Sequence, residues 1–170
     1  SLGSRQIPDG VYYGIQTDRA VENFPISGLK AHPRFVDAYL YVKKAAALAN
    51  LKEGVLPKES AQAIVKACDE ILAGGLRDQF PVDVFQMGAG TGFNMNVNEV
   101  IANRANEILG RPKGSYAPVH PNDHANMGQS TNDTFPTAMR LALLLILKEH
   151  LHDPLEALEK EFFSKGEEFD

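Results

Sequence analysis

Two segments of the sequence concentrate small hydrogen-bonding side chains, residues 86–104 (QMGAGTGFNMNVNEVIANR) and residues 118–140 (PVHPNDHANMGQSTNDTFPTAMR). Ser130, Thr131 and Asn132 come just ahead of a hydrophobic stretch with the pattern of a helix. Because the first turn of a helix has unpaired N–H groups and partial positive charge, side-chain and main-chain donors could together hold a small anion there. The chemistry that these residues indicate is the binding of a small anion.

A structural alternative accounts for the same residues. Ser-Thr-Asn-Asp before a helix is also typical of ordinary N-capping. Gly88, Gly90 and Gly92 flank Thr91 and would let another backbone come close to a ligand, but their spacing matches no nucleotide-binding fingerprint. Capping and a polar, glycine-rich anion pocket both remain open from the pattern alone.

Helices must position these donors, because apolar residues recur at helical spacing through most of the chain. Residues 78–86 are expected to be strand-like or irregular, and Pro154 is expected to kink the last helix. The asparagines of the third helix should be hydrogen-bonded, since unbonded asparagine weakens a helix interior. Helices are predicted at about 34–51, 57–73, 94–109 and from 136 onward, and the asparagines are Asn94, Asn96, Asn98 and Asn103.

Composition and charge exclude several classes of function. A net charge of −5, with no basic cluster, argues against nucleic acid or an anionic membrane surface as a partner. Cys68 is the one cysteine and keeps helical step with Ile64 and Ile71, which predicts a core residue rather than a reactive thiol. A lone cysteine and no secretion signal suit a reducing, cytoplasmic location. The lysines at 43, 44, 58 and 66 are expected on solvated helix faces.

The helix after Pro136 is apolar on every side from Leu141 to Leu147, a pattern that indicates burial all round. The run is far shorter than the ~20 residues that span a bilayer. A chain of this size has little with which to surround such a helix. We therefore expect residues 141–163 to associate with partner helices.

Three sequence blocks resemble a known enzyme family: GAGT-x-x-NMN-x-NEVIANRA (88–105), HPNDHxN (120–126) and QSTNDTFPTAMRLA (129–142). They are similar to the N-terminal third of the aspartase and class II fumarase superfamily. GAGT and QSTND favour aspartate ammonia-lyase, whereas VNEV (97–100) and VHPND (119–123) are more typical of fumarase. The resemblance covers nearly the whole chain.

The resemblance implies a mainly α fold. Residues 1–135 would form the N-terminal helical lyase domain, and residues 136–170 would begin the central helix bundle through which four full-length subunits assemble. It also implies that the loop carrying the catalytic serine lies beyond residue 170. No catalytic residue is therefore expected within this chain, and the chain alone should be inactive.

The implied reaction is anti elimination of ammonia from L-aspartate to give fumarate through an aci-carboxylate intermediate, with no metal or organic cofactor. Thr91, Ser130 and Thr131 match positions that bind the β-carboxylate, and Asn132 matches one that contacts the amino group. Two alternatives stay open. One is hydration of fumarate to L-malate by the same architecture, and the other is a non-catalytic helical module that binds anions.

His120, Asn122 and Asp123 match an accessory anion site of class II fumarases. Taken alone, His120 and Asp123 could also transfer protons, since histidine titrates near neutral pH and a carboxylate can orient it. We favour a turn or an accessory anion site for these residues, and a structural position for His124.

Overall fold

The computed structural model describes residues 4–169, which form helices and loops with no named strand. The start of the predicted first domain, residues 1–3, lies outside the described residues. The helices are α1 (Ile15–Asn23), α2 (Pro33–Lys52), α3 (Lys58–Leu72), α4 (Thr91–Ile108), α5 (Thr131–His150) and α6 (His152–Phe169), with short turns η1 (Arg77–Gln79) and η2 (Pro121–Ala125). The mainly α prediction is confirmed. Residues 78–86 contain η1 and irregular chain, with a single bridge between Lys30 and Asp83.

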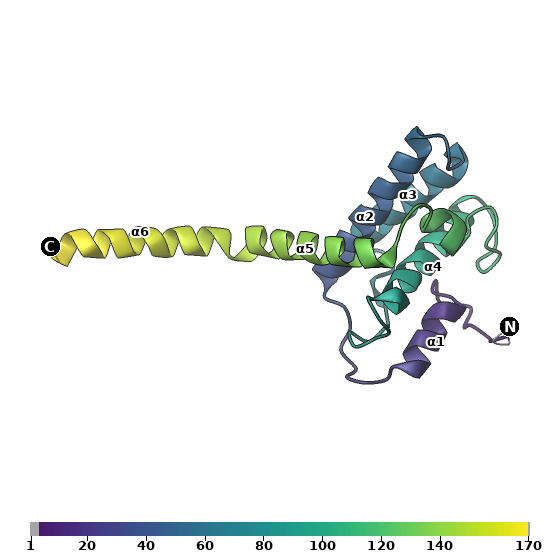
Figure 1. Ribbon diagram of the computed structural model, residues 1–170, viewed down its shortest axis with the longest axis horizontal. Helices are drawn as coiled ribbons and strands as arrows, with labels where there is room; N and C mark the ends of the chain where they lie inside the picture. The colour runs from purple at the N-terminus through teal and green to yellow at the C-terminus, as the bar shows by residue number, and fades with distance from the viewer. Residues whose placement is uncertain (1–3, 170) are drawn as a thin grey trace.

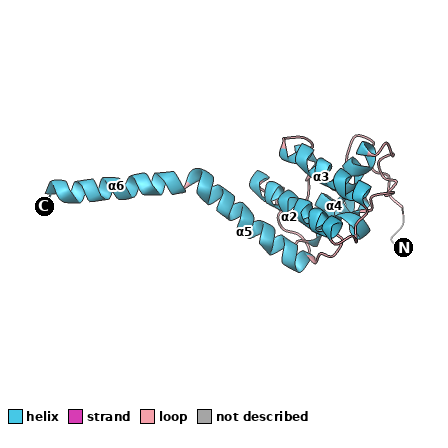
Figure 2. Ribbon diagram, turned by 90° about the horizontal axis from the view of Figure 1, so that it is seen from above, coloured by secondary structure: helices cyan, strands magenta, loops and turns pink. Residues whose placement is uncertain are grey.

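The chain has a packed body and a long arm (Figure 1). Helices α1 to α4 and η2 form the body, and α5 leads out of it into α6. A turned view shows that the arm bends where α5 gives way to α6 (Figure 2). The bend falls at Leu151, three residues before Pro154. A proline in the first turn of α6 has no N–H for the carbonyl four residues earlier, which explains why the helix breaks there.

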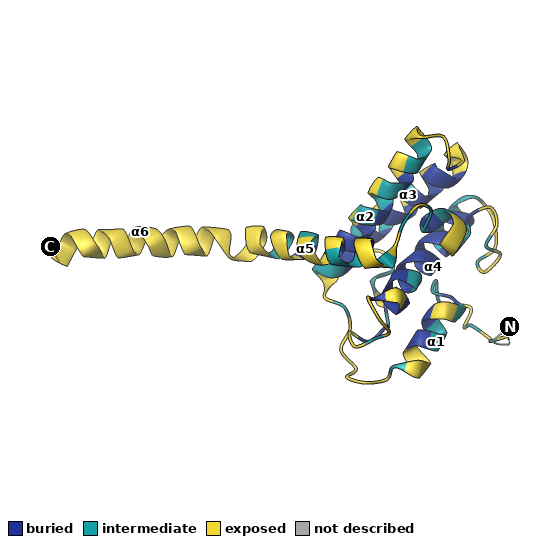
Figure 3. Cartoon of the chain, viewed as in Figure 1, coloured by how far each residue is buried: buried dark blue, intermediate teal, exposed yellow. Residues whose placement is uncertain are grey.

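Helix α4 is the centre of the body and contacts α1, α3 and η2. Most of its residues are buried, as the dark blue ribbon in Figure 3 shows. Its asparagines are bonded as predicted: Asn96 donates to the carbonyl of Gln79, and Asn103 donates to the carbonyl of Tyr12. The amides of α4 therefore tie the surrounding loops to the core.

Two buried side chains of α2 and α3 test the predicted burial, which is correct for Cys68 and wrong for Lys43. Cys68 is fully buried, and burial raises the pKa of its thiol to about 12, which confirms a core residue. Lys43 was expected on a solvated face and is instead 1% exposed. It lies one helical turn after the buried Tyr39 and one turn before the buried Ala47, so its position on the helix fixes its burial.

The apolar run in α5 is buried on one face only. Ala138 and Ala142 are buried where α5 packs against α2, whereas Leu143 and Leu144 are 59% and 63% exposed. The expected all-round burial is therefore not found within the single chain. The described residues of α6 are exposed throughout. No helix among the described residues is long and apolar enough to span a membrane.

Candidate functional site

The N-terminal ends of α4 and α5 meet, and Gly90 is the residue that allows it. Gly90 is the N-cap of α4 and has φ of +87°. A Cβ placed on it would lie 2.0 Å from Cδ2 of Phe135, which is in the second turn of α5. The close approach that the glycines were expected to permit is thus made by an aromatic ring rather than by another backbone. The two predicted donor segments are brought together as a result.

A hydrogen-bonded bridge through Tyr39 holds the same two helix ends. The Tyr39 hydroxyl donates to Oδ1 of Asn94 at 3.1 Å and lies 3.1 Å from Oγ1 of Thr134. Asn94 is one turn after Thr91, and Thr134 is one turn after Thr131. The bridge therefore fixes the first turns of both helices, which carry the predicted anion-binding donors.

The four predicted donors have no side-chain hydrogen bonds to other residues in the described part of the chain. Thr91, Ser130 and Asn132 are exposed, and Thr131 is half-buried. Their hydroxyl and amide groups are consequently available to a ligand.

The capping alternative is wrong for the Ser130 side chain. Ser130 occupies the N-cap position of α5, but its hydroxyl makes no capping bond. The helix also begins earlier than the predicted start at Pro136, because the Ser130 carbonyl already accepts from the backbone N–H groups of Asp133 and Thr134. Thr131 and Asn132 thus belong to the first turn, where unpaired N–H groups accompany their side chains.

Beneath the donors lies a polar network that sequence analysis missed. Lys43 Nζ donates to Oδ1 of Asn126 and to Oε1 of Gln129, both at 2.9 Å. Asn126 Oδ1 also accepts from the side-chain amides of Asn94 and Asn98. Helical spacing from Tyr39 was the signal that could have placed Lys43 inside.

Burial lowers the pKa of Lys43 to about 7, because removal from water disfavours its charged form. No carboxylate lies within ion-pair distance of its ammonium among the described residues. The ammonium is stabilised instead by amide oxygens and by the Tyr39 ring, whose centroid is 5.6 Å away. An unneutralised positive charge therefore lies under the start of α5 whenever Lys43 is protonated.

His120, Asn122 and Asp123 lie at the start of η2, the turn that leads into this network. Nδ1 of His120 accepts from the backbone N–H groups of Asn122 and Asp123, each at 3.2 Å. The same nitrogen is 3.3 Å from Oδ2 of Asp123, but an acceptor nitrogen has no proton to give that carboxylate. His124 Nδ1 accepts from the His120 N–H, which is a structural role. The structure thus shows a turn, and the accessory anion site stays a prediction.

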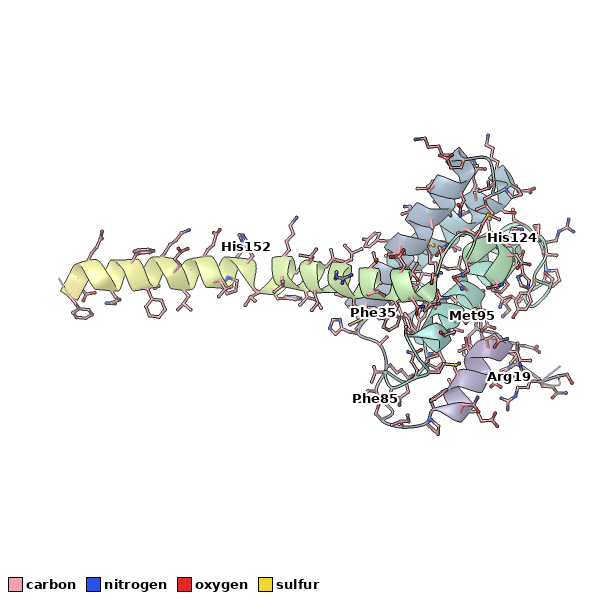
Figure 4. The ribbon with its side chains drawn as sticks, in the orientation of Figure 1. Arg19, Phe35, Phe85, Met95, His124 and His152 are labelled. Carbon is pink, nitrogen blue, oxygen red and sulfur yellow. The ribbon has the colours of Figure 1, made fainter. Side chains whose placement is uncertain are left out.

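A view with side chains drawn relates these elements (Figure 4). Met95 of α4 and His124 of η2 lie in the body, whereas His152 lies out on the arm. The described residues contain no cluster of three or more His, Cys, Asp or Glu side chains suited to a metal. The arrangement gathers neutral donors, two helix N-termini and one buried lysine.

Comparison with known proteins places the chain among lyases. It is 52% identical over 168 residues to an aspartate ammonia-lyase of a Bacillus species, and 55% identical over 170 residues to a class II fumarate hydratase of Halobacterium salinarum. These matches cover 99% and 100% of the chain but only 36% of each relative, so the chain spans about a third of the length of the curated relatives it matches.

Solved structures agree with these relatives. A Brucella melitensis protein described as fumarate lyase:delta crystallin, bound to cobalt, superimposes with a TM-score of 0.91 at 56% identity, over 99% of this chain and 37% of that one. A class II fumarase from Schistosoma mansoni gives a TM-score of 0.82 at 42% identity, over 86% of this chain and 31% of that one. Residues 3–170 match the family described as Lyase, and the chain belongs to that family.

Proposed function

We propose that the chain is the carboxylate-binding part of a carbon–nitrogen lyase that eliminates ammonia from L-aspartate to give fumarate. The observation that carries the proposal is the set of unbonded donors on the first turns of α4 and α5, held side by side by Gly90, Phe135 and Tyr39. A carboxylate there would receive hydrogen bonds from hydroxyl groups and from helix N-termini.

In the proposed reaction, a base outside this chain removes a proton from Cβ of aspartate, and the electron pair of that bond moves into the β-carboxylate. The resulting aci-carboxylate carries an extra negative charge. Thr91, Ser130 and Thr131 would donate hydrogen bonds to it, and such donors lower the barrier where charge develops. Collapse of the intermediate forms the C=C bond and breaks the Cα–N bond, whose electron pair goes to nitrogen. The protonated amino group, which Asn132 would contact, thus leaves as ammonia.

Hydration of fumarate to L-malate is the second candidate. It requires the same carboxylate donors, but water adds across the C=C bond, whereas the first candidate reaction releases ammonia. The relatives named as fumarate hydratases support it as directly as those named as aspartate ammonia-lyases support the first. The GAGT and QSTND sequences are the reason for preferring the ammonia-lyase.

The proposed working form is a cytoplasmic homotetramer of the full-length protein. Its support is the row of exposed apolar side chains on the arm, which one chain leaves in water. This row comprises Leu143, Leu144, Leu147, Leu151, Leu155, Leu158, Phe162 and Phe163.

The test is to incubate the full-length protein separately with L-aspartate and with L-malate, and to follow the absorbance of fumarate. Formation of fumarate from aspartate alone supports the first candidate, and formation from malate alone replaces it with the second. No product from either substrate would leave the non-catalytic module as the better account. The 170-residue chain by itself is expected to give no turnover, because the family resemblance implies that the serine that removes the Cβ proton lies on a loop beyond residue 170.

A further inference from the structure

The loop of residues 126–130 connects η2 to α5 and determines where the donors of α5 lie. Within it, Asn126 Nδ2 donates to the carbonyl of Gln129, and Gln129 Nε2 donates to the carbonyls of Ala125 and Met127. The NH2 group of each side-chain amide therefore donates to backbone carbonyls in or next to the loop. The two amide oxygens both accept from Lys43 of α2, and Asn126 Oδ1 accepts in addition from the side-chain amides of Asn94 and Asn98 on α4.

Lys43 is well suited to fix this loop. An amide side chain fits its site in two orientations, related by exchange of its oxygen and nitrogen. Lys43, which can only donate, selects the orientation of the Gln129 amide that turns the oxygen toward it. At Asn126 it selects the orientation together with the donating amides of Asn94 and Asn98. Burial of a lysine that has no carboxylate partner costs free energy. The packing of the core does not require a lysine at this position. A methionine would fill the same space without that cost.

From this geometry we infer that Lys43 is a positioning residue. It holds the 126–130 loop so that Ser130, Thr131 and Asn132 face the ligand, and its charge favours a dicarboxylate at the start of α5. The inference rests on the proposed function as far as the ligand is concerned. The inference that Lys43 helps to position the loop rests on its hydrogen bonds to Asn126 and Gln129 and requires no ligand.

Binding of a dicarboxylate should then be coupled to protonation of Lys43. With a pKa of about 7 the group is partly neutral near neutral pH, and an anion nearby favours its charged form. Among the described residues, the titratable groups that face it are Tyr39 on its own helix and Cys68 on α3, while η2 and the following loop present amides. Tyr39 and Cys68 both have pKa values raised to about 12, so neither changes charge near pH 7.

The experiment uses the full-length protein with Lys43→Met, and Lys44→Met as the matched control. Lys44 is the next residue, forms an ion pair with Asp69 on the surface and does not touch the loop. Succinate, an unreactive dicarboxylate, is titrated calorimetrically near pH 7 in two buffers of different ionisation enthalpy, which gives the number of protons taken up. We expect uptake of about half a proton by the wild type and by Lys44→Met, and none by Lys43→Met. Lys43→Met should also bind succinate at least ~10-fold more weakly, the effect of losing one charged interaction.

Hydrogen exchange of the backbone amides at 126–130 provides the second readout, and it does not depend on any ligand. Lys43→Met should exchange at least ~10-fold faster there, with amides of α3 unchanged. Equal protection in the two variants would overturn the positioning role. Succinate binding without proton uptake by the wild type would overturn the role of the charge. A wild type that binds no succinate would instead refute the proposed function, while the exchange data still decide the positioning.

Should Lys43→Met fail to fold, the wild type itself supplies the test. The ¹³Cε resonance of Lys43 is followed against pH with and without succinate, and its midpoint is expected to rise by about one unit when succinate is present. An unchanged midpoint in a protein that binds succinate would contradict the inference.

Discussion

A Cβ on Gly90 would lie 2.0 Å from Cδ2 of Phe135, so the aromatic ring occupies the space that any other residue's side chain would need. Gly90 also has φ of +87°, a conformation that residues with a Cβ adopt only with strain. The lack of space for a Cβ and the positive φ both occur at the junction of α4 and α5. The contact therefore joins the two halves of the candidate site and makes glycine necessary.

Gly90→Ala should lower the free energy of unfolding by about 3 kcal/mol or more, from backbone strain and steric overlap together. Gly88→Ala is the matched control. Its φ is +55° and no atom lies within 4 Å of the added Cβ, so only the strain of about 1 kcal/mol is expected. Urea unfolding of the two variants measures the difference. Equal losses would mean that the ring does not restrict this position.

Glu99→Gln should destabilise the body by about 2 to 4 kcal/mol. The buried carboxylate accepts from the backbone N–H groups of Gly14, Gln16 and Thr17 and from the Thr17 hydroxyl. A glutamine would turn an N–H group toward these donors and leave buried groups unpaired. Glu107→Gln, at an exposed position on the same helix, should cost less than ~1 kcal/mol. Thermal unfolding compares the two.

Lys43→Met should remove a pH dependence of stability. Lysine titrates near 10.4 in an unfolded chain, whereas burial lowers the Lys43 pKa to about 7 in the folded protein. Between these values the unfolded state binds more protons, so folding stability rises as pH increases. Relative to Lys43→Met, the wild type should gain about 2 to 3 kcal/mol from pH 7 to pH 9.5. Parallel urea curves at the two pH values would show that Lys43 is not perturbed.

In the full-length protein, Thr91→Ala and Asn132→Ala should each lower kcat/KM of the proposed reaction by ~100-fold or more, the scale observed when one oxyanion donor is removed. His120→Ala should change turnover little, since its Nδ1 is used in the turn of η2. Thr137→Ala, exposed further along α5, is the control for α5. Loss of activity in His120→Ala with near-normal Thr91→Ala would reverse the assignment of the main and accessory sites.

The 170-residue chain should form a dimer or larger species through residues 141–163. Its exposed leucines and phenylalanines would each gain on the order of 1.5 to 3 kcal/mol on full burial. Leu144→Asp with Leu155→Asp, both at side chains more than half exposed, should yield a monomer with unchanged helix content. Light scattering at micromolar concentration tests this, and a monomeric wild type would refute it.

The sequence by itself determined α2, α3 and α4, the core position of Cys68 and the bonded asparagines of α4, but it did not predict α1 and it began α5 five residues late. These follow from local patterns, since helical periodicity, glycine stops and the cost of unbonded amides depend on neighbours along the chain. It also identified the two donor segments, because hydroxyl and amide side chains are visible as residue types.

Only the tertiary structure decided how these donors are held. The Phe135 ring against Gly90, the Tyr39 bridge and the burial of Lys43 join residues 45 to 95 positions apart in the chain. The structure also decided that Leu143 and Leu144 stay exposed, where the pattern predicted burial on all sides. These contacts depend on packing between elements that are distant in the sequence. Composition and local spacing do not predict which elements will pack together.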